Sequence, residues 1–87
     1  MSRSDTIRDL DCVVLLCDVA GWDGDTGSRV FRGGAIGTVV HEYDDGTAFE
    51  VEFVRDDGQT LGFVTAERDS LRLATKADIE GRPTAAA

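Results

Sequence analysis

His41, Cys12 and Cys17 are the side chains best suited to acid–base, nucleophilic or metal chemistry in this sequence. A general base must reach the proton that it removes, and no spacing in the chain obliges a serine or cysteine to lie beside the single histidine. A zinc site needs three or four ligands, which one histidine and a Cys-x4-Cys pair do not supply. We therefore expect no catalytic residue, no metal site and no cofactor, and we predict that the protein is not an enzyme.

An Asp-Asp-Gly motif occurs twice, at residues 44–46 and 56–58. Paired aspartates invite a calcium interpretation, but each motif supplies too few oxygen ligands at the wrong spacing for a calcium loop. Asp-Gly is typical of tight hairpin turns, because both residues tolerate a positive φ. Each motif therefore predicts a turn between two strands.

Trp22 lies in a glycine-rich segment, residues 19–34, together with Asp23 and Asp25. A tryptophan in such a segment either closes the open end of a small β-domain or anchors a partner at the surface, and the sequence leaves both open. With Tyr43, these residues would form an acidic, aromatic rim that favours a basic partner segment. We predict that Trp22, Asp23, Asp25 and Tyr43 bind this partner.

Alternating apolar residues predict the strands that would position this rim. The clearest strand is 48–54, in which Phe49, Val51 and Phe53 face inward and two glutamates face outward. In a later strand, Leu61, Phe63 and Thr65 are expected to share one face. The other predicted strands span residues 10–18, 35–43, 59–65 and 70–74, with a short helical turn at 65–69.

Five short strands, tight turns and one long early loop predict an all-β fold, a small five-stranded barrel. A chain of 87 residues is long enough for one domain. We expect a flexible N-terminus over residues 1–9, with Ile7 as its only anchor, and a β-barrel domain over residues 10–75. Residues 76–87 are expected to form a disordered tail, because the apolar pattern stops after Thr75.

The net charge of −8 arises from 17 acidic and 9 basic residues. That sign repels a phosphate backbone, so we expect no nucleic-acid partner. The longest apolar run, residues 12–17, is far shorter than the roughly 20 residues of a membrane-spanning helix. The first residues lack the apolar run of a signal peptide, so a cytoplasmic location is expected.

Three segments carry a recognisable pattern: L-D-x-V-V-L-L-x-D from Leu10, G-x-x-G-T-V-V from Gly34 and Y-x-x-G-x-A-x-E-V-E-F from Tyr43. Over residues 7–73 the chain resembles a family of short, uncharacterised bacterial proteins, a domain of unknown function with a Src-homology-3-like barrel. The resemblance implies that fold and a bacterial setting, but no activity and no functional residues. The segment 19–34 is longer here than expected for the family. Gly34-x-x-Gly37-x-Val39 is also similar, more weakly, to KOW-type modules, in which this loop and strand contact RNA or ribosomal protein.

These observations predict a non-enzymatic protein-binding module that engages a basic partner. The most specific version is an antitoxin-like or immunity-like role, since the resemblance implies toxin-like neighbours for some family members. Two alternatives stay open. An accessory subunit that stabilises an enzyme complex would expose an apolar patch, and a KOW-like RNA binder would need a cluster of cations.

Overall fold

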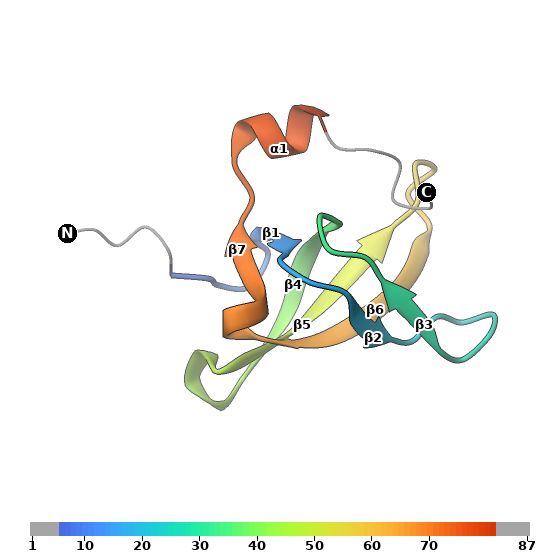
Figure 1. Ribbon diagram of the computed structural model, residues 1–87, viewed down its shortest axis with the longest axis horizontal. Coiled ribbons are helices and arrows are strands. Elements are labelled where there is room, and N and C mark those ends of the chain that lie inside the picture. The colour runs from blue at the N-terminus through green and yellow to red at the C-terminus, as the bar shows by residue number, and fades with distance from the viewer. Residues whose placement is uncertain (1–5, 82–87) are drawn as a thin grey trace.

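The strands form a five-stranded antiparallel sheet and a separate two-stranded hairpin (Figure 1). The computed structural model describes residues 6–81. The large sheet has the strand order β6-β5-β4-β1-β7, and β2 pairs with β3 in the hairpin. The predicted all-β fold with a five-stranded sheet is confirmed. The strands are β1 (Cys12–Leu15), β2 (Val19–Gly21), β3 (Arg29–Phe31), β4 (Ile36–Tyr43), β5 (Ala48–Val54), β6 (Thr60–Glu67) and β7 (Leu71–Leu73).

The core lies on the inner side of the sheet, under the hairpin. Phe49, Val51 and Phe53 of β5 are all at most 1% exposed, and the residues between them are half-buried, as their alternation predicts. Phe31 of the hairpin stacks on Phe53, with ring centroids 4.7 Å apart. Gly37 lies at a close approach of two strands, because a Cβ atom there would lie 2.6 Å from Cγ1 of Val51 and 2.8 Å from the Glu52 carbonyl oxygen.

Strand β6 departs from the sequence prediction at one position, and that position decides which side chains face the core. Phe53 pairs with Gly62 whereas Val54 pairs with Thr60, so Leu61 is the extra residue of a β-bulge. Leu61 remains buried, but the bulge shifts the alternation by one residue. The prediction that Leu61 and Phe63 share one face is therefore wrong, since Leu61 is buried whereas Phe63 turns to the outer side and is half-buried.

Both Asp-Asp-Gly motifs form turns at the predicted places. The first is the 3-10 turn η1 (Asp44–Gly46), whose three residues all have positive φ, at 51°, 58° and 94°. Aspartate and glycine tolerate this left-handed region better than other residues. The second turn closes when the Gly58 N–H donates to the Arg55 carbonyl at 2.9 Å. The predicted helical turn is the 3-10 turn η2 (Arg68–Ser70), which begins after a longer β6 than the sequence suggested.

The ordered domain begins before residue 10. The Ile7 side chain is 6% exposed and belongs to the core cluster, as expected for the anchor of the N-terminal segment. The Leu10 N–H then donates to the Val39 carbonyl at 2.7 Å, which attaches this segment to β4. Residues 1–5 lie outside the described part of the chain.

A short helix, α1 (Lys76–Gly81), follows β7 where a disordered tail was expected. The prediction is wrong for these residues because a capping box starts the helix. The Thr75 hydroxyl accepts from the Asp78 N–H at 3.1 Å, and the Asp78 carboxylate accepts from the Thr75 N–H at 2.7 Å. Arg72 of β7 also pairs with Asp78 at 2.7 Å. Residues 82–87 of the expected tail lie outside the described residues.

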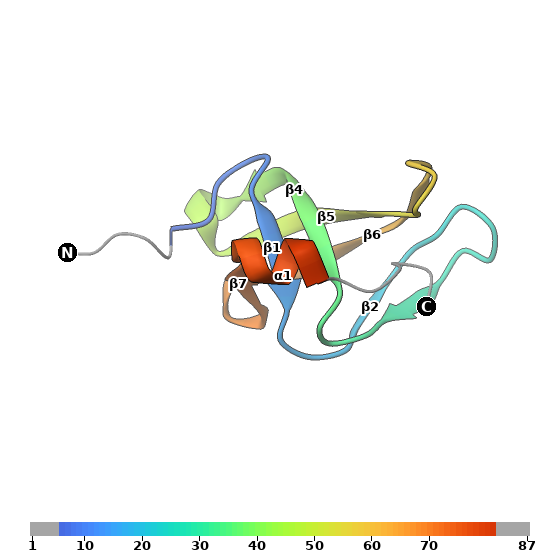
Figure 2. The ribbon, with the colours of Figure 1, turned by 90° about the horizontal axis from the view of Figure 1, so that it is seen from above.

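Helix α1 lies over β1 in both views of the ribbon (Figure 2). Val14 and Ile36 are paired across β1 and β4 and are buried, although neither belongs to the core cluster on the inner side. Over residues 6–81, no helix is long and apolar enough to cross a membrane.

Candidate protein-binding face

The long segment predicted to carry the partner site is organised around the Asp23 carboxylate. This side chain accepts hydrogen bonds from the backbone N–H groups of Asp25 and Thr26, at 2.9 and 2.7 Å, and pairs with Arg29 at 3.5 Å. The Thr26 N–H is the main reason that the pKa of Asp23 lies below its usual value, and the other donors reinforce it. Asp23 is 4% exposed, so it shapes the loop and does not reach a partner.

A second aspartate closes the base of the same hairpin. Asp18 accepts a hydrogen bond from the Gly33 N–H at 2.9 Å and pairs with Arg32 at 3.1 Å. The Gly33 N–H, and then the Arg32 guanidinium, lower the pKa of the Asp18 carboxyl. Together, Asp18 and Asp23 fix the hairpin at its base and at its tip.

Trp22 attaches the hairpin to β6 through its backbone and leaves its indole at the surface. The Trp22 N–H donates to the Phe63 carbonyl at 2.8 Å, and the Phe63 N–H donates back to the Trp22 carbonyl at 2.9 Å. Residues paired in this way project their side chains to the same face of a sheet. Trp22 is 54% exposed, so of the two alternatives left by the sequence, the structure favours a surface position over a plug of the core.

This face is the outer side of β4, β5 and β6, extended by Trp22, and we call it the outer face. Its members follow from the β5 residues that point away from the core and from their partners on the two neighbouring strands. They are Trp22, Thr38, His41, Tyr43, Ala48, Glu50, Glu52, Val54, Thr60, Phe63, Thr65 and Glu67. The outer face thus has aromatic side chains at both ends, three glutamates, and no Lys or Arg.

Threonines of β6 orient the two central glutamates of the outer face. The Thr65 hydroxyl donates to Oε1 of Glu50 at 2.7 Å, and the Thr60 hydroxyl donates to Oε2 of Glu52 at 2.6 Å. Each bond leaves the second carboxylate oxygen without a hydrogen bond from residues 6–81. Both carboxylates are therefore held in place and can accept from an external donor.

Tyr43 and His41 form the other aromatic end of the outer face. Their rings meet edge to face with centroids 4.5 Å apart. The Tyr43 hydroxyl donates to Oε1 of Glu50 in a long hydrogen bond of 3.4 Å. Partial burial, and then the neighbouring Glu50 charge, raise the pKa of the Tyr43 phenol, so it stays protonated and remains a donor at neutral pH.

The four residues predicted to bind a partner do not form one rim. Trp22 and Tyr43 share the outer face, but the Trp22–Phe63 pair and Tyr43 are about four residues apart along the strands, roughly 13 Å. Asp25 is exposed near the hairpin tip and pairs with Arg55 across 3.7 Å. Figure 1 shows that this tip and the η1 turn lie at opposite ends of the molecule.

Phe63 is the member of the face that sequence reasoning missed. Its strand reads as a simple alternation, which predicts that Phe63 shares one face with Leu61. The signal available in the sequence was the pair Leu61-Gly62: only glycine fits at the second position, where a Cβ atom would lie 2.8 Å from the Phe31 ring.

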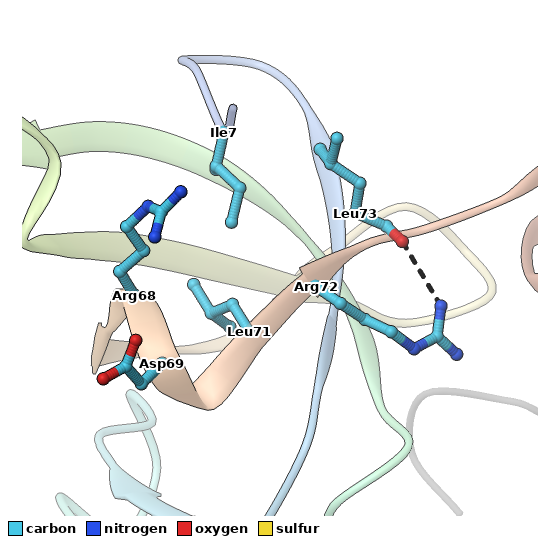
Figure 3. Close-up of a pocket in the computed structure, with 6 residues that line it drawn as sticks. All are labelled: Ile7, Arg68, Asp69, Leu71, Arg72 and Leu73. Carbon is cyan, nitrogen blue, oxygen red and sulfur yellow. Dashed lines mark hydrogen bonds between the residues drawn. The ribbon is translucent and has the colours of Figure 1, made fainter. Parts of the chain in front are cut away.

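Two shallow hollows lie elsewhere on the surface. One, of about 250 Å³, is lined by Ile7, Leu71 and Leu73 with the arginines of η2 and β7 around it (Figure 3). It is smaller than typical ligand pockets, which measure about 300–1,000 Å³. The other, of about 480 Å³, lies between η1 and η2 and is lined mainly by polar residues.

Neither the cysteines nor the acidic residues form a metal centre in the described chain. Cys12 is half-buried, Cys17 is exposed, and both are free thiols. Within residues 6–81, no three His, Cys, Asp or Glu side chains come together in a way that could hold a metal ion.

The fold and this face define a small all-β domain with an acidic, aromatic sheet surface. Residues 10–73 match a family described as a domain of unknown function, DUF4926. The protein belongs to this family. Comparison with curated proteins and with solved structures found no match.

Proposed function

We propose that the protein is a binding module that engages a basic segment of another protein through its outer face. The observation that carries this proposal is the 54% exposure of Trp22 on a surface that has the carboxylates of Glu50, Glu52 and Glu67 and no Lys or Arg side chain. Tryptophan is the residue type most enriched at binding hot spots, and exposed indoles next to apolar side chains mark interaction sites. The carboxylates select a partner of opposite charge.

The order of the elements supports a Src-homology-3-like barrel. A long hairpin follows β1, a three-stranded meander of β4, β5 and β6 comes next, and the turn η2 leads into β7, which returns to β1. Barrels of this type often bind peptide segments through exposed residues. An antitoxin-like or immunity-like protein would bind a segment of its partner in the same way. In this chain the aromatic surface lies on the outer sheet, beside the attachment point of the hairpin.

A role as an accessory subunit of an enzyme complex is the second candidate. Leu10 is 77% exposed and Leu16 is 53% exposed, and neither belongs to the outer face. Leu10 also has a φ of 72°, an unfavourable backbone conformation for leucine that holds its side chain in solvent. An apolar contact through these leucines would persist at high salt.

Binding to RNA has less support. Residues 6–81 carry seven Arg and Lys side chains, and five of them, Arg29, Arg32, Arg55, Arg72 and Lys76, pair with carboxylates. A phosphate backbone would have to compete with each of these pairs.

The test compares three baits in a lysate of the host: the unchanged protein, Trp22→Ala and Leu16→Ala. We expect the unchanged protein and Leu16→Ala to retain a stoichiometric basic protein at low salt and to release it at high salt. Trp22→Ala should lose that partner while its thermal midpoint changes little, because its indole is largely exposed. Retention by Trp22→Ala, combined with loss by Leu16→Ala at any salt concentration, would reject the outer face in favour of the accessory-subunit role.

A further inference from the structure

We infer that the outer face selects arginine over lysine in its partner, an inference that rests on the proposed function and specifies the chemistry of the bound group. The backbone pair between Trp22 and Phe63 places these two side chains next to each other on the outer face. Phe63 in turn lies directly opposite Glu52 on β5. An indole, a phenyl ring and a carboxylate therefore follow one another in a row across three strands.

The carboxylate in this row is already oriented. The Thr60 hydroxyl holds Oε2 of Glu52 at 2.6 Å, and Oε1 receives no hydrogen bond from residues 6–81. Glu50, two residues away on the same strand and the same face, is held in the same way by Thr65. An incoming donor would meet fixed acceptors, so less side-chain freedom would be lost on binding than with unrestrained glutamates.

Aromatic rings next to a fixed carboxylate suit a guanidinium better than an ammonium group. The guanidinium is planar and weakly hydrated, so it can stack on a ring with its face and donate to a carboxylate from its edge at the same time. The lysine ammonium is a compact, strongly hydrated charge that cannot do both without losing water. The row of Trp22, Phe63 and Glu52 offers both contacts within reach of one side chain.

The same combination already occurs inside this protein. On the inner side of the hairpin, Arg29 lies over the Phe31 ring, 5.8 Å from its centroid, and pairs with the Asp23 carboxylate at 3.5 Å. The outer face repeats the ring and the carboxylate of this arrangement but lacks the arginine, which a partner would supply.

The experiment titrates the full chain at low salt with two peptides, acetyl-Gly-Ser-Arg-Ser-Arg-Ser-Gly-amide and its counterpart with lysine in both basic positions. Trp22 is the only tryptophan, so its fluorescence reports binding at the outer face directly. We expect the arginine peptide to bind about 3- to 5-fold more tightly than the lysine peptide, the size of one exposed cation–π contact. Phe63→Leu and Glu52→Gln should each reduce this ratio towards one.

The matched control is Asp69→Asn, which removes the same charge from an exposed position on η2, outside the row of Trp22, Phe63 and Glu52. It should keep the ratio unchanged. Equal affinity for the two peptides, with binding of both lost in Trp22→Ala as measured by isothermal titration calorimetry, would overturn the preference for arginine and leave the proposed function standing. Failure of both peptides to bind would overturn the preference together with the proposal of a basic partner at this face.

Discussion

Phe53 and Phe63 form a matched pair of substitutions that tests the register of β6. They are the same residue type on neighbouring strands, and an unbroken alternation would place both in the core. In the structure Phe53 is 1% exposed and stacks on Phe31, whereas the bulge at Leu61 turns Phe63 to the outer face. Truncation to alanine should therefore affect the two sites very differently.

The expected costs follow from the two environments. Replacing a fully buried phenylalanine by alanine costs about 3–5 kcal/mol of unfolding free energy, and the stacked partner adds about 0.5–1.5 kcal/mol. For a half-buried ring that leaves no closed cavity, we expect about 1 kcal/mol. Small domains have a total stability of about 5–15 kcal/mol, so Phe53→Ala should unfold much of the population and Phe63→Ala should not.

Urea unfolding followed by far-UV circular dichroism measures both variants. Because we expect Phe53→Ala to leave too little folded protein for a full transition, Phe53→Leu and Phe63→Leu provide a second comparison. We expect a loss of about 1–2 kcal/mol at position 53 and a change within about 0.5 kcal/mol at position 63. Equal costs at the two positions would refute the register that defines the outer face, and with it the placement of Phe63 beside Glu52.

Three further predictions concern the loops and the helix. Gly37→Ala should lower the free energy of unfolding by about 1–3 kcal/mol, because the new methyl group would lie 2.8 Å from the Glu52 carbonyl oxygen. Gly24→Ala, with open space around the new methyl group, serves as the control. Equal thermal midpoints for the two variants would contradict the close approach at Gly37. Asp23→Ala should lower the urea midpoint at neutral pH. The folded state lowers the pKa of this carboxyl below its ordinary 3.8, so its contribution to the free energy of unfolding is complete above that value and is lost as the pH falls through the folded pKa. The difference in urea midpoint between Asp23→Ala and the unchanged protein should therefore narrow below pH 3.8. A difference that does not depend on pH would contradict the role of the charge. Asp78→Asn should move the backbone carbon chemical shifts of residues 76–81 from helical towards random-coil values, with little change in global stability. The reason is that it weakens both the capping box and the bidentate pair with Arg72. Unchanged helical shifts would show that neither the cap nor the ion pair is needed to hold α1.

Much of the fold could be predicted from the sequence because short apolar runs are separated by Asp-Gly turns, and because β5 obeys a simple alternation. The bounds of β5 were predicted to the residue, and both Asp-Gly turns lie where their chemistry places them. The bulge in β6 could not be predicted in the same way, because it depends on the Phe31 ring and the Trp22 backbone, which the hairpin brings against Gly62. Helix α1 could not be predicted because its stability comes from the cap and an ion pair with β7. Neither feature produces the apolar periodicity from which a helix is predicted.

The candidate site was predicted only in part, for a related reason. Exposure of Trp22 and burial of Asp23 are properties of one dipeptide, and a strand that alternates must turn the two side chains to opposite sides. A long loop over residues 19–34 implies no such alternation, so the sequence alone places both residues on the same rim. Once Trp22 is paired with β6, the neighbouring aspartate has to lie on the inner side, where it caps the hairpin turn.

The isolated pair between Trp22 and Phe63 has a kinetic consequence. The hairpin joins β6 through two reciprocal backbone hydrogen bonds at the same two residues whose side chains form the aromatic end of the outer face. A ligand that covers both side chains spans this junction and holds it closed. Dissociation of such a ligand and opening of the hairpin would then be coupled events, so amide hydrogen exchange at Trp22 and Phe63 would slow together when the ligand binds.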